Sequence, residues 1–199
     1  GAPTVEFFGG AGGEGAAGKV ILGKFINKLD TENIFGGVQQ TASILGVEIT
    51  KPGQGYTEAP FVSFNDSCND GYGAYGRAII DQNISSPTYG QVTGVTVVTE
   101  GAGYPAEEYE PEDLYIDQIV IEQPGNGYDP NDTFEDPNLT PIIEDGRIVS
   151  VQVNQVPYRI LPKLNIKTST GIGAFVRPIM SNARREPQEV IQVIDCYSH

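Results

Sequence analysis

The stretch PGQGYTEAPFVSF, Pro52 to Phe64, decides the fold because its centre recurs twice more along the chain. The centre returns as EGAGYP, Glu100 to Pro105, and as PGNGYD, Pro124 to Asp129. A short segment rich in β-branched residues precedes each copy, as GVEIT, GVTVV and QIVIE. A recurring unit of strand, glycine turn, tyrosine and second strand indicates a repeat architecture.

The residues of this stretch have ordinary turn chemistry. In Lys51-Pro52-Gly53, proline and glycine occupy the positions that suit a type II turn, where the glycine has positive φ. Gly55 frees the backbone just before Tyr56, and Pro60 opens the next strand. A glycine loop that binds phosphate would continue into a helix, whereas a strand follows here. We therefore expect a structural corner in which the tyrosine packs over the turn.

The composition predicts an all-β protein, because 25 Gly and 14 Pro are interleaved with β-branched runs in a chain of 199 residues. The net charge is −14, from 26 acidic and 12 basic residues. This balance argues against nucleic acid and against an anionic membrane surface as partners. The acidic residues concentrate between Glu107 and Glu144, which is typical of a solvated face. The sequence contains no apolar run that predicts a membrane span and no secretory signal.

The first residues match the second half of the first full repeat. PTVEF, Pro3 to Phe7, corresponds to PFVSF, Pro60 to Phe64. GAAGKVI, Gly15 to Ile21, corresponds to GAYGRAI, Gly73 to Ile79. The chain thus starts inside a repeat, and we expect it to have been cut from a longer protein.

The segment from Lys19 to Gln40 is the least repetitive, and we interpret it as a long connection. Asp30 and Thr31 could form a turn, or the segment could contain one helical turn. The apolar residues of that helical turn would be Phe25, Ile26, Leu29 and Ile34.

We divide the chain into the end of a preceding repeat with its connection (1–43), a repeat region (44–180) and a tail (181–199). The predicted units are 44–80, 89–113, 114–143 and 145–180. The fourth unit keeps Tyr158 but has lost the corner glycines, and GIGAFVRPIM at Gly171 restores the return strand. In the tail, EVIQVIDCY is apolar on both faces, which predicts a strand that is buried or paired with another chain. The spacing of the units is irregular, so a sandwich, a prism and a β-helix-like body remain alternatives.

Two polar loops contain the oxygen ligands that calcium prefers. The first is Asp66 to Gly71, but an EF-hand needs a glutamate at its twelfth position, which is Arg77 here. The second contains Asp129, Asn131 and Asp132. Polar turn chemistry accounts for both loops. We predict no catalytic residue, no cofactor and no metal ligand in this chain.

Other reactive side chains could act only in combination. Cys68 and Cys196 could form a disulfide or remain free thiols. Cys196 and His199 could supply two ligands to a metal site completed by three chains around an axis. A glycosidase pair would depend on the separation of carboxylates in space, and a run of acids in a loop is usually solvated. The carboxylates concerned are those of Glu107, Glu108, Glu110 and Glu112. The basic pair Arg184 and Arg185 balances nearby acid.

The repeat pattern is G-x-[IV]-x-x-[IV]-x-[IV]-x-x-x-G-x-G-Y-x-x-x-P-x-[VI]-x-[IF], followed by G-x-G-A-x-x-[RK]. It resembles β repeats in virion structural proteins of tailed phages, above all the large T4-like phages of marine bacteria. Residues Gly46 to Ile79 carry it best, and Gly90 to Tyr104, Ile116 to Tyr128 and Gly146 to Met180 carry it in part. The repeat is also similar to those of some large bacterial surface proteins. The resemblance implies an all-β, intertwined homotrimer in a tail fibre, spike or baseplate, and it carries over no catalytic residue.

We therefore expect a non-enzymatic scaffold that is located in the virion, assembled in the host cytoplasm and bound to other tail proteins. The alternative is an adhesin repeat or a module that binds host glycan by stacking sugars on exposed aromatic rings. That alternative requires several tyrosines to face solvent, namely Tyr72, Tyr75, Tyr109 and Tyr115. A depolymerase on the same scaffold would need two carboxylates in one groove.

Overall fold

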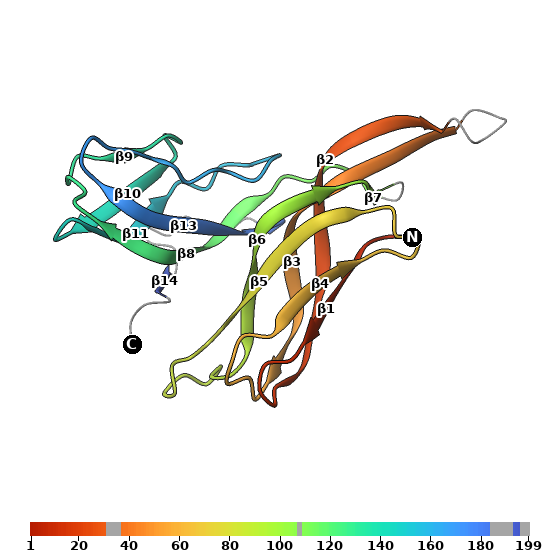
Figure 1. The fold of residues 1–199 in the computed structure, drawn as a ribbon, viewed down its shortest axis with the longest axis horizontal. Helices are drawn as coiled ribbons and strands as arrows, with labels where there is room; N and C mark the ends of the chain where they lie inside the picture. Colours follow the sequence, from red (N-terminus) through yellow and green to blue (C-terminus); the bar gives the residue numbers. More distant parts are fainter. Residues whose placement is uncertain (31–36, 107–108, 184–192, 196–199) are drawn as a thin grey trace. The chain divides into compact units, whose positions relative to one another are not determined.

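The computed structural model describes residues 1–30, 37–106, 109–183 and 193–195. These residues form strands, turns and loops without a helix, so the all-β prediction is confirmed (Figure 1). Within these ranges no helix is long and apolar enough to cross a membrane. The chain divides into two compact units, Gly1–Glu112 (unit 1) and Asp113–His199 (unit 2).

Unit 1 contains two sheets with the strand orders β1-β4-β5-β6 and β2-β3-β7, and neighbouring strands in both are antiparallel. Its strands are β1 (Thr4–Phe8), β2 (Glu14–Asp30), β3 (Gly37–Gln54), β4 (Phe61–Asn65), β5 (Tyr72–Ile80), β6 (Val92–Ala102) and β7 (Tyr104–Pro105).

The two sheets of unit 1 share one apolar core. Val47 of β3 lies in this core together with Val62 of β4, Ile80 of β5 and Val95 of β6. Tyr56, from the first GxGY corner, belongs to the same cluster. The repeated motif therefore contributes directly to the core.

Unit 2 contains three small sheets with the orders β13-β8-β14, β10-β11 and β12-β9. Its strands are β8 (Tyr115–Asn126), β9 (Thr133–Phe134), β10 (Leu139–Glu144), β11 (Arg147–Val153), β12 (Ile166–Lys167), β13 (Ile172–Ser181) and β14 (Val193–Asp195).

One antiparallel ladder occurs three times, as β2–β3, β5–β6 and β13–β8. Ala16, Ala74 and Ala174 hold the same place in it, opposite Pro52, Glu100 and Pro124. In every copy a β-bulge follows the next residue, and a second bulge lies four residues further along. A bulge increases local twist and fixes register, so three ladders with the same two bulges have the same shape.

Unit 2 repeats the strand pairings of unit 1 in a different chain order. β13 pairs with β8 as β2 pairs with β3, and β10 pairs with β11 as β5 pairs with β6. β12 pairs with β9 as β1 pairs with β4. In addition, β8 packs against β11 as β3 packs against β6. Unit 2 therefore begins with the equivalent of β3 and ends with the equivalents of β1 and β2, which is a circular permutation of unit 1.

The prediction of a connection with a helical turn between Lys19 and Gln40 is wrong. β2 continues to Asp30 and β3 begins at Gly37, so most of this segment is an antiparallel hairpin. The pairing register shifts between Gly23 and Ile26, and Lys24 has a φ of 53°. This bulge interrupts the strand alternation, which gave the apolar residues a spacing like that of a helix. Ile34 lies outside the described residues.

The tail strand is confirmed for Val193–Asp195, which forms β14. It pairs in parallel with β8 of the same chain, with Val193 opposite Ile119.

Candidate functional site

The GxGY corners lie where β3, β6 and β8 end. Their first glycines, Gly53, Gly101 and Gly125, have φ values of 66°, 64° and 66°. A Cβ at any of them would lie 2.5–2.6 Å from a backbone atom of the facing strand. Only glycine meets both requirements, so the expected positive φ at Gly53 is confirmed.

The tyrosine of each corner packs on the glycine that immediately precedes the facing strand. A Cβ on that glycine would lie only 2.1 Å from the ring Cδ1 atom in all three copies. The tyrosine Oη accepts a hydrogen bond from the N–H of the alanine three residues after this glycine, at 3.0–3.4 Å. We call this arrangement the tyrosine clasp. Its members are Tyr56 with Gly13 and Ala16, Tyr104 with Gly71 and Ala74, and Tyr128 with Gly171 and Ala174.

The clasp explains why glycine, tyrosine and alanine recur together in the sequence. The flat ring needs a facing residue without a side chain, and its hydroxyl accepts a hydrogen bond from a backbone N–H near the start of the facing strand. Tyr56, Tyr104 and Tyr128 are 3%, 2% and 7% exposed, so each ring is a buried structural element. The expectation that the tyrosine covers the corner is confirmed.

Tyr158 makes the same strand contact as Tyr104, although its segment lacks the corner glycines. It forms an antiparallel bridge with Leu114, the residue just before β8, as Tyr104 pairs with Ala42 of β3. Its hydroxyl donates to a carboxylate oxygen of Asp136 at 2.9 Å. Burial raises the pKa of Tyr158 far above its ordinary value, and the hydrogen bond and negative charge of Asp136 raise it further.

The Asp66 loop is organised by its own backbone. Burial favours the neutral form of Asp66, but N–H groups of Gly71, Asp70 and Cys68 donate to its carboxylate at 3.0–3.1 Å, and the pKa is lowered. Burial raises the pKa of Tyr104, and the charge of Asp66 adds to this effect. The Asp66 carboxylate thus acts as the acceptor that closes this loop.

The second polar loop is also a hydrogen-bonded turn. The Asp129 carboxylate accepts from the backbone and side-chain N–H groups of Asn131, and these bonds lower its pKa. Asp132 accepts from the N–H of Asp129 at 2.9 Å. In the part of the chain that the structure describes, no group of three or more His, Cys, Asp or Glu residues could hold a metal ion.

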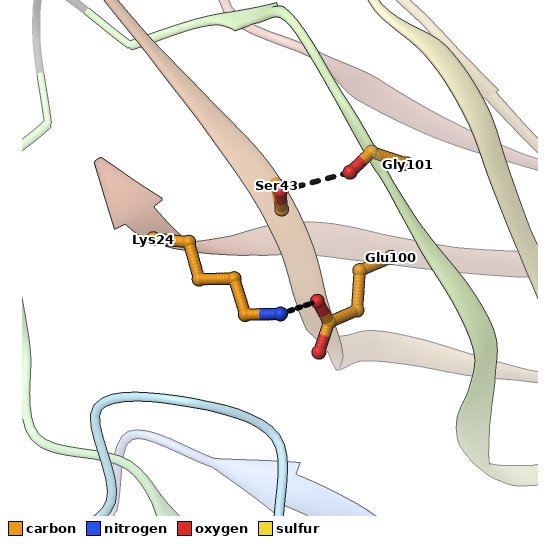
Figure 2. Close-up of polar contacts among 4 residues, drawn as sticks. All are labelled: Lys24, Ser43, Glu100 and Gly101. Carbon is orange, nitrogen blue, oxygen red and sulfur yellow. Dashed lines mark hydrogen bonds and ion pairs between the residues drawn. The ribbon is translucent and has the colours of Figure 1, made fainter. Parts of the chain in front are cut away.

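The middle of the β2–β3 hairpin contacts the second GxGY corner through an ion pair and a hydrogen bond. Figure 2 shows the ion pair between Lys24 and Glu100, and the Ser43 hydroxyl that donates to the Gly101 carbonyl at 2.8 Å. Lys24 is the left-handed residue of the β2 bulge, so the bulge directs its side chain toward β6. Beyond this junction the hairpin extends past the other strands of unit 1 (Figure 1).

The distal part of this hairpin, which we call the arm (24–30 and 37–41), exposes apolar side chains. Leu29 and Val38 are cross-strand partners and are 78% and 61% exposed. Ile26 is 55% exposed. Such a paired apolar surface is typical of a protein contact.

An aromatic surface lies on the four-stranded sheet of unit 1. Phe8 of β1 and Phe61 of β4 are register partners with stacked rings, 5.6 Å between centroids and 28° between planes. Both rings are more than half exposed. Phe61 also pairs with Arg77 of β5, and Tyr75 is exposed two residues before Arg77. We define the aromatic surface as Phe8, Phe61, Tyr75 and Arg77.

The four tyrosines of the glycan hypothesis divide into two pairs. Tyr72 and Tyr75 are exposed, whereas Tyr109 and Tyr115 are half-buried. Sequence reasoning missed Phe8 and Phe61. The alternation in PTVEFF, which places Thr4, Glu6 and Phe8 on one face, was the available signal.

Several other candidates lie outside the described residues. They are Glu107, Glu108, Arg184, Arg185, Cys196 and His199. The disulfide and the Cys196/His199 metal site therefore stay hypotheses, and Cys68 is exposed. Glu110 and Glu112 are exposed.

No known protein family, curated protein or solved structure matches the chain.

Proposed function

We propose that the chain is a non-enzymatic structural component of a phage virion, in a tail fibre, spike or baseplate. It acts there as a rigid scaffold during host attachment or penetration. In this proposal the strand-turn-strand repeats form an elongated sandwich, prism or β-helix-like body, three copies intertwine as a homotrimer, and other tail proteins bind it. Assembly takes place in the host cytoplasm, and the protein then resides in the virion.

The observation that carries the proposal is the threefold recurrence of the tyrosine clasp. Every member of the repeated motif has a mechanical role: the glycines admit the turn and the ring, the tyrosine fills the site, and the alanine N–H is bonded. A buried tyrosine removes about 150–250 Å² from water and fixes the ends of two strands together. Repetition of such a device supports a role in resisting deformation.

The arm supports the trimer part of the proposal. Its exposed apolar pair, Leu29 and Val38, offers a surface that association of copies would bury. Light scattering of the purified chain at micromolar concentration is expected to give the mass of a trimer. The double variant Leu29→Ser/Val38→Ser should shift the mass toward that of the monomer. Ile84→Ser is the matched control, because Ile84 is 81% exposed outside the arm.

A monomer at all concentrations would contradict the trimer. A trimer that survives the double variant would place the interface elsewhere and leave the scaffold role in force.

The aromatic surface favours a second candidate function, the binding of host glycan. The stacked rings of Phe8 and Phe61 form an apolar platform, and Glu6 and Asn65 lie exposed on the same face of β1 and β4. Sugars present C–H groups to such rings and hydroxyls to polar neighbours.

A screen of host-surface polysaccharides by saturation-transfer NMR tests this function. Phe61→Ala should weaken binding by about tenfold or more, which corresponds to about 1.4 kcal/mol. Tyr89→Ala should have little effect, since Tyr89 is a 45% exposed aromatic residue outside the aromatic surface. Equal losses in the two variants, or no binding to any polysaccharide, would refute the glycan function.

A further inference from the structure

In unit 2 the successive strands β12 and β13 pair with β9 and β8, which lie far earlier in the chain. β8 ends at Asn126 and β13 begins at Ile172, so β9 to β12 intervene between two paired strands. In unit 1 the equivalent strands β2 and β3 are consecutive and form a hairpin. The place beside β8 is therefore filled by a strand, β13, that is separated from β8 by four other strands in the sequence.

The strand received there shares its ladder register and its clasp with proximal β2. Both strands carry an alanine in the clasp, face two bulges of the partner strand at the same positions, and contain consecutive buried residues after the first bulge. Those residues are Val20, Ile21 and Leu22 in β2, and Pro178, Ile179 and Met180 in β13. Ile21 would replace Ile179 and Leu22 would replace Met180, which are volume-conserving changes that cores tolerate, whereas Val20 would replace Pro178 and Gly18 would replace the buried Val176.

The atoms of the clasp also coincide. The Ala16 N–H lies 3.2 Å from the Tyr56 hydroxyl, and the Ala174 N–H lies 3.0 Å from the Tyr128 hydroxyl. A Cβ at Gly13 or Gly171 would lie 2.1 Å from Cδ1 of the corresponding ring.

The strand before the clasp strand corresponds as well. β1 precedes β2 and pairs antiparallel with β4, while β12 precedes β13 and pairs antiparallel with β9. The pair β1–β2 can thus offer both contacts that β12–β13 makes in unit 2.

We propose that the β8–β9 surface of unit 2 is a strand-binding site for the β1–β2 segment of a second copy of this chain. Binding occurs by exchange, with β12–β13 displaced and the incoming strands taking up the same register and the same clasp. Exchange keeps the ladder register and the clasp, it places Gly18 where the buried Val176 lies, and its rate depends on opening of β13. This site does not depend on the virion assignment, because it follows from the permuted strand order alone.

The test uses the full-length chain and a fluorescent synthetic peptide of residues 3–23, which contains β1 and proximal β2. In the Gly171→Val variant the new side chain collides with the Tyr128 ring, so β13 no longer fills its site. The peptide should bind this variant with one-to-one stoichiometry, measured by fluorescence anisotropy. It should bind the unmodified chain at least about tenfold more weakly, because β13 competes there.

The peptide with Gly13→Val is the matched control, and it should not bind the Gly171→Val chain. Ala174→Pro is a second acceptor, because it removes the N–H that the Tyr128 hydroxyl accepts while keeping Gly171. The methyl NMR signals of Ile119, Ile148 and Val151, which are buried in unit 2, report that each acceptor is folded. Failure of the peptide to bind a folded acceptor, or equal binding of the Gly13→Val peptide, would overturn the proposal.

Discussion

Substitution of Gly71 by alanine should destabilise unit 1, although the same change at an unconstrained position would stabilise it. Gly71 lacks a positive φ, so alanine fits its backbone conformation and would by itself add about 0.4–1 kcal/mol through the unfolded chain. The three atoms nearest to the new Cβ, however, all belong to the Tyr104 ring, at 2.1–2.6 Å. The ring must therefore leave its site.

The magnitude follows from the burial of Tyr104, which is 2% exposed. A tyrosine buries about 150–250 Å². Loss of half of this burial at about 25 cal/mol per Å² costs about 2–3 kcal/mol. After subtraction of the gain in the unfolded chain, the free energy of unfolding should fall by about 1–3 kcal/mol.

Urea unfolding followed by circular dichroism measures this change, and a double-mutant cycle with Tyr104→Ala isolates its cause. Without the ring, Gly71→Ala should become neutral or stabilising, because the three atoms nearest to the new methyl group all belong to that ring. Gly12→Ala is the control: Gly12 has a φ of 99° and open space around its Cβ, so its backbone strain should be independent of Tyr104. A Gly71→Ala chain as stable as the unmodified one would refute the packing of the clasp.

Three further outcomes are expected. Tyr128→Phe should lower the free energy of unfolding by about 1 kcal/mol in urea titrations, because the Ala174 N–H loses its acceptor, whereas Tyr72→Phe on the surface should change it little. The lowered pKa of Asp66 contributes stability that is present above about pH 4 and is lost as the pH falls through the lowered pKa. Asp66→Asn should lower the free energy of unfolding by about 1–3 kcal/mol at pH 7. The same variant should flatten the acid side of a profile of the free energy of unfolding against pH. The raised pKa of Tyr158 means that the free energy of unfolding falls as the pH rises above about 10, the pKa of tyrosine in the unfolded chain. In Tyr158→Phe the free energy of unfolding should fall less over this alkaline range, as measured by unfolding experiments at a series of pH values.

Much of the local structure could be predicted from the sequence, because it depends on short-range chemistry. The positive φ of Gly53 could be predicted from its place after proline, although Lys51–Gln54 continue strand β3 and do not form the expected type II turn, and the role of Tyr56 follows from recurrence. The hydrogen bond from Ala16 could not be predicted, since it joins residues 40 positions apart. The bulge at Lys24 produced the wrong helical interpretation, because an inserted residue shifts every later side chain to the other face.

The candidate surfaces show the same division. Exposure of Tyr72 and Tyr75 agrees with the requirement set for the glycan hypothesis, but the stacking of Phe8 on Phe61 arises from the pairing of β1 with β4. The matches of PTVEF with PFVSF and of DGRIVSVQV with YGQVTGVTV were visible in the sequence. They did not reveal that unit 2 takes its strands in permuted order, because the choice of partner for each strand is a long-range property.

The permuted order of unit 2 means that the two compact units begin at different strands of the same repeat. The strands recur in groups of three, which we call steps; β1, β2 and β3 form one step. Each compact unit contains six successive strands of this series. Unit 1 begins with the first strand of a step, and unit 2 begins with the equivalent of β3, the third strand. The boundary of a unit is thus independent of the boundary of a repeat. Insertion of a whole step would keep each existing strand with its matching partner, whereas insertion of a single strand would leave one partner without its match. Such a chain can change in length by duplication while its core chemistry stays the same.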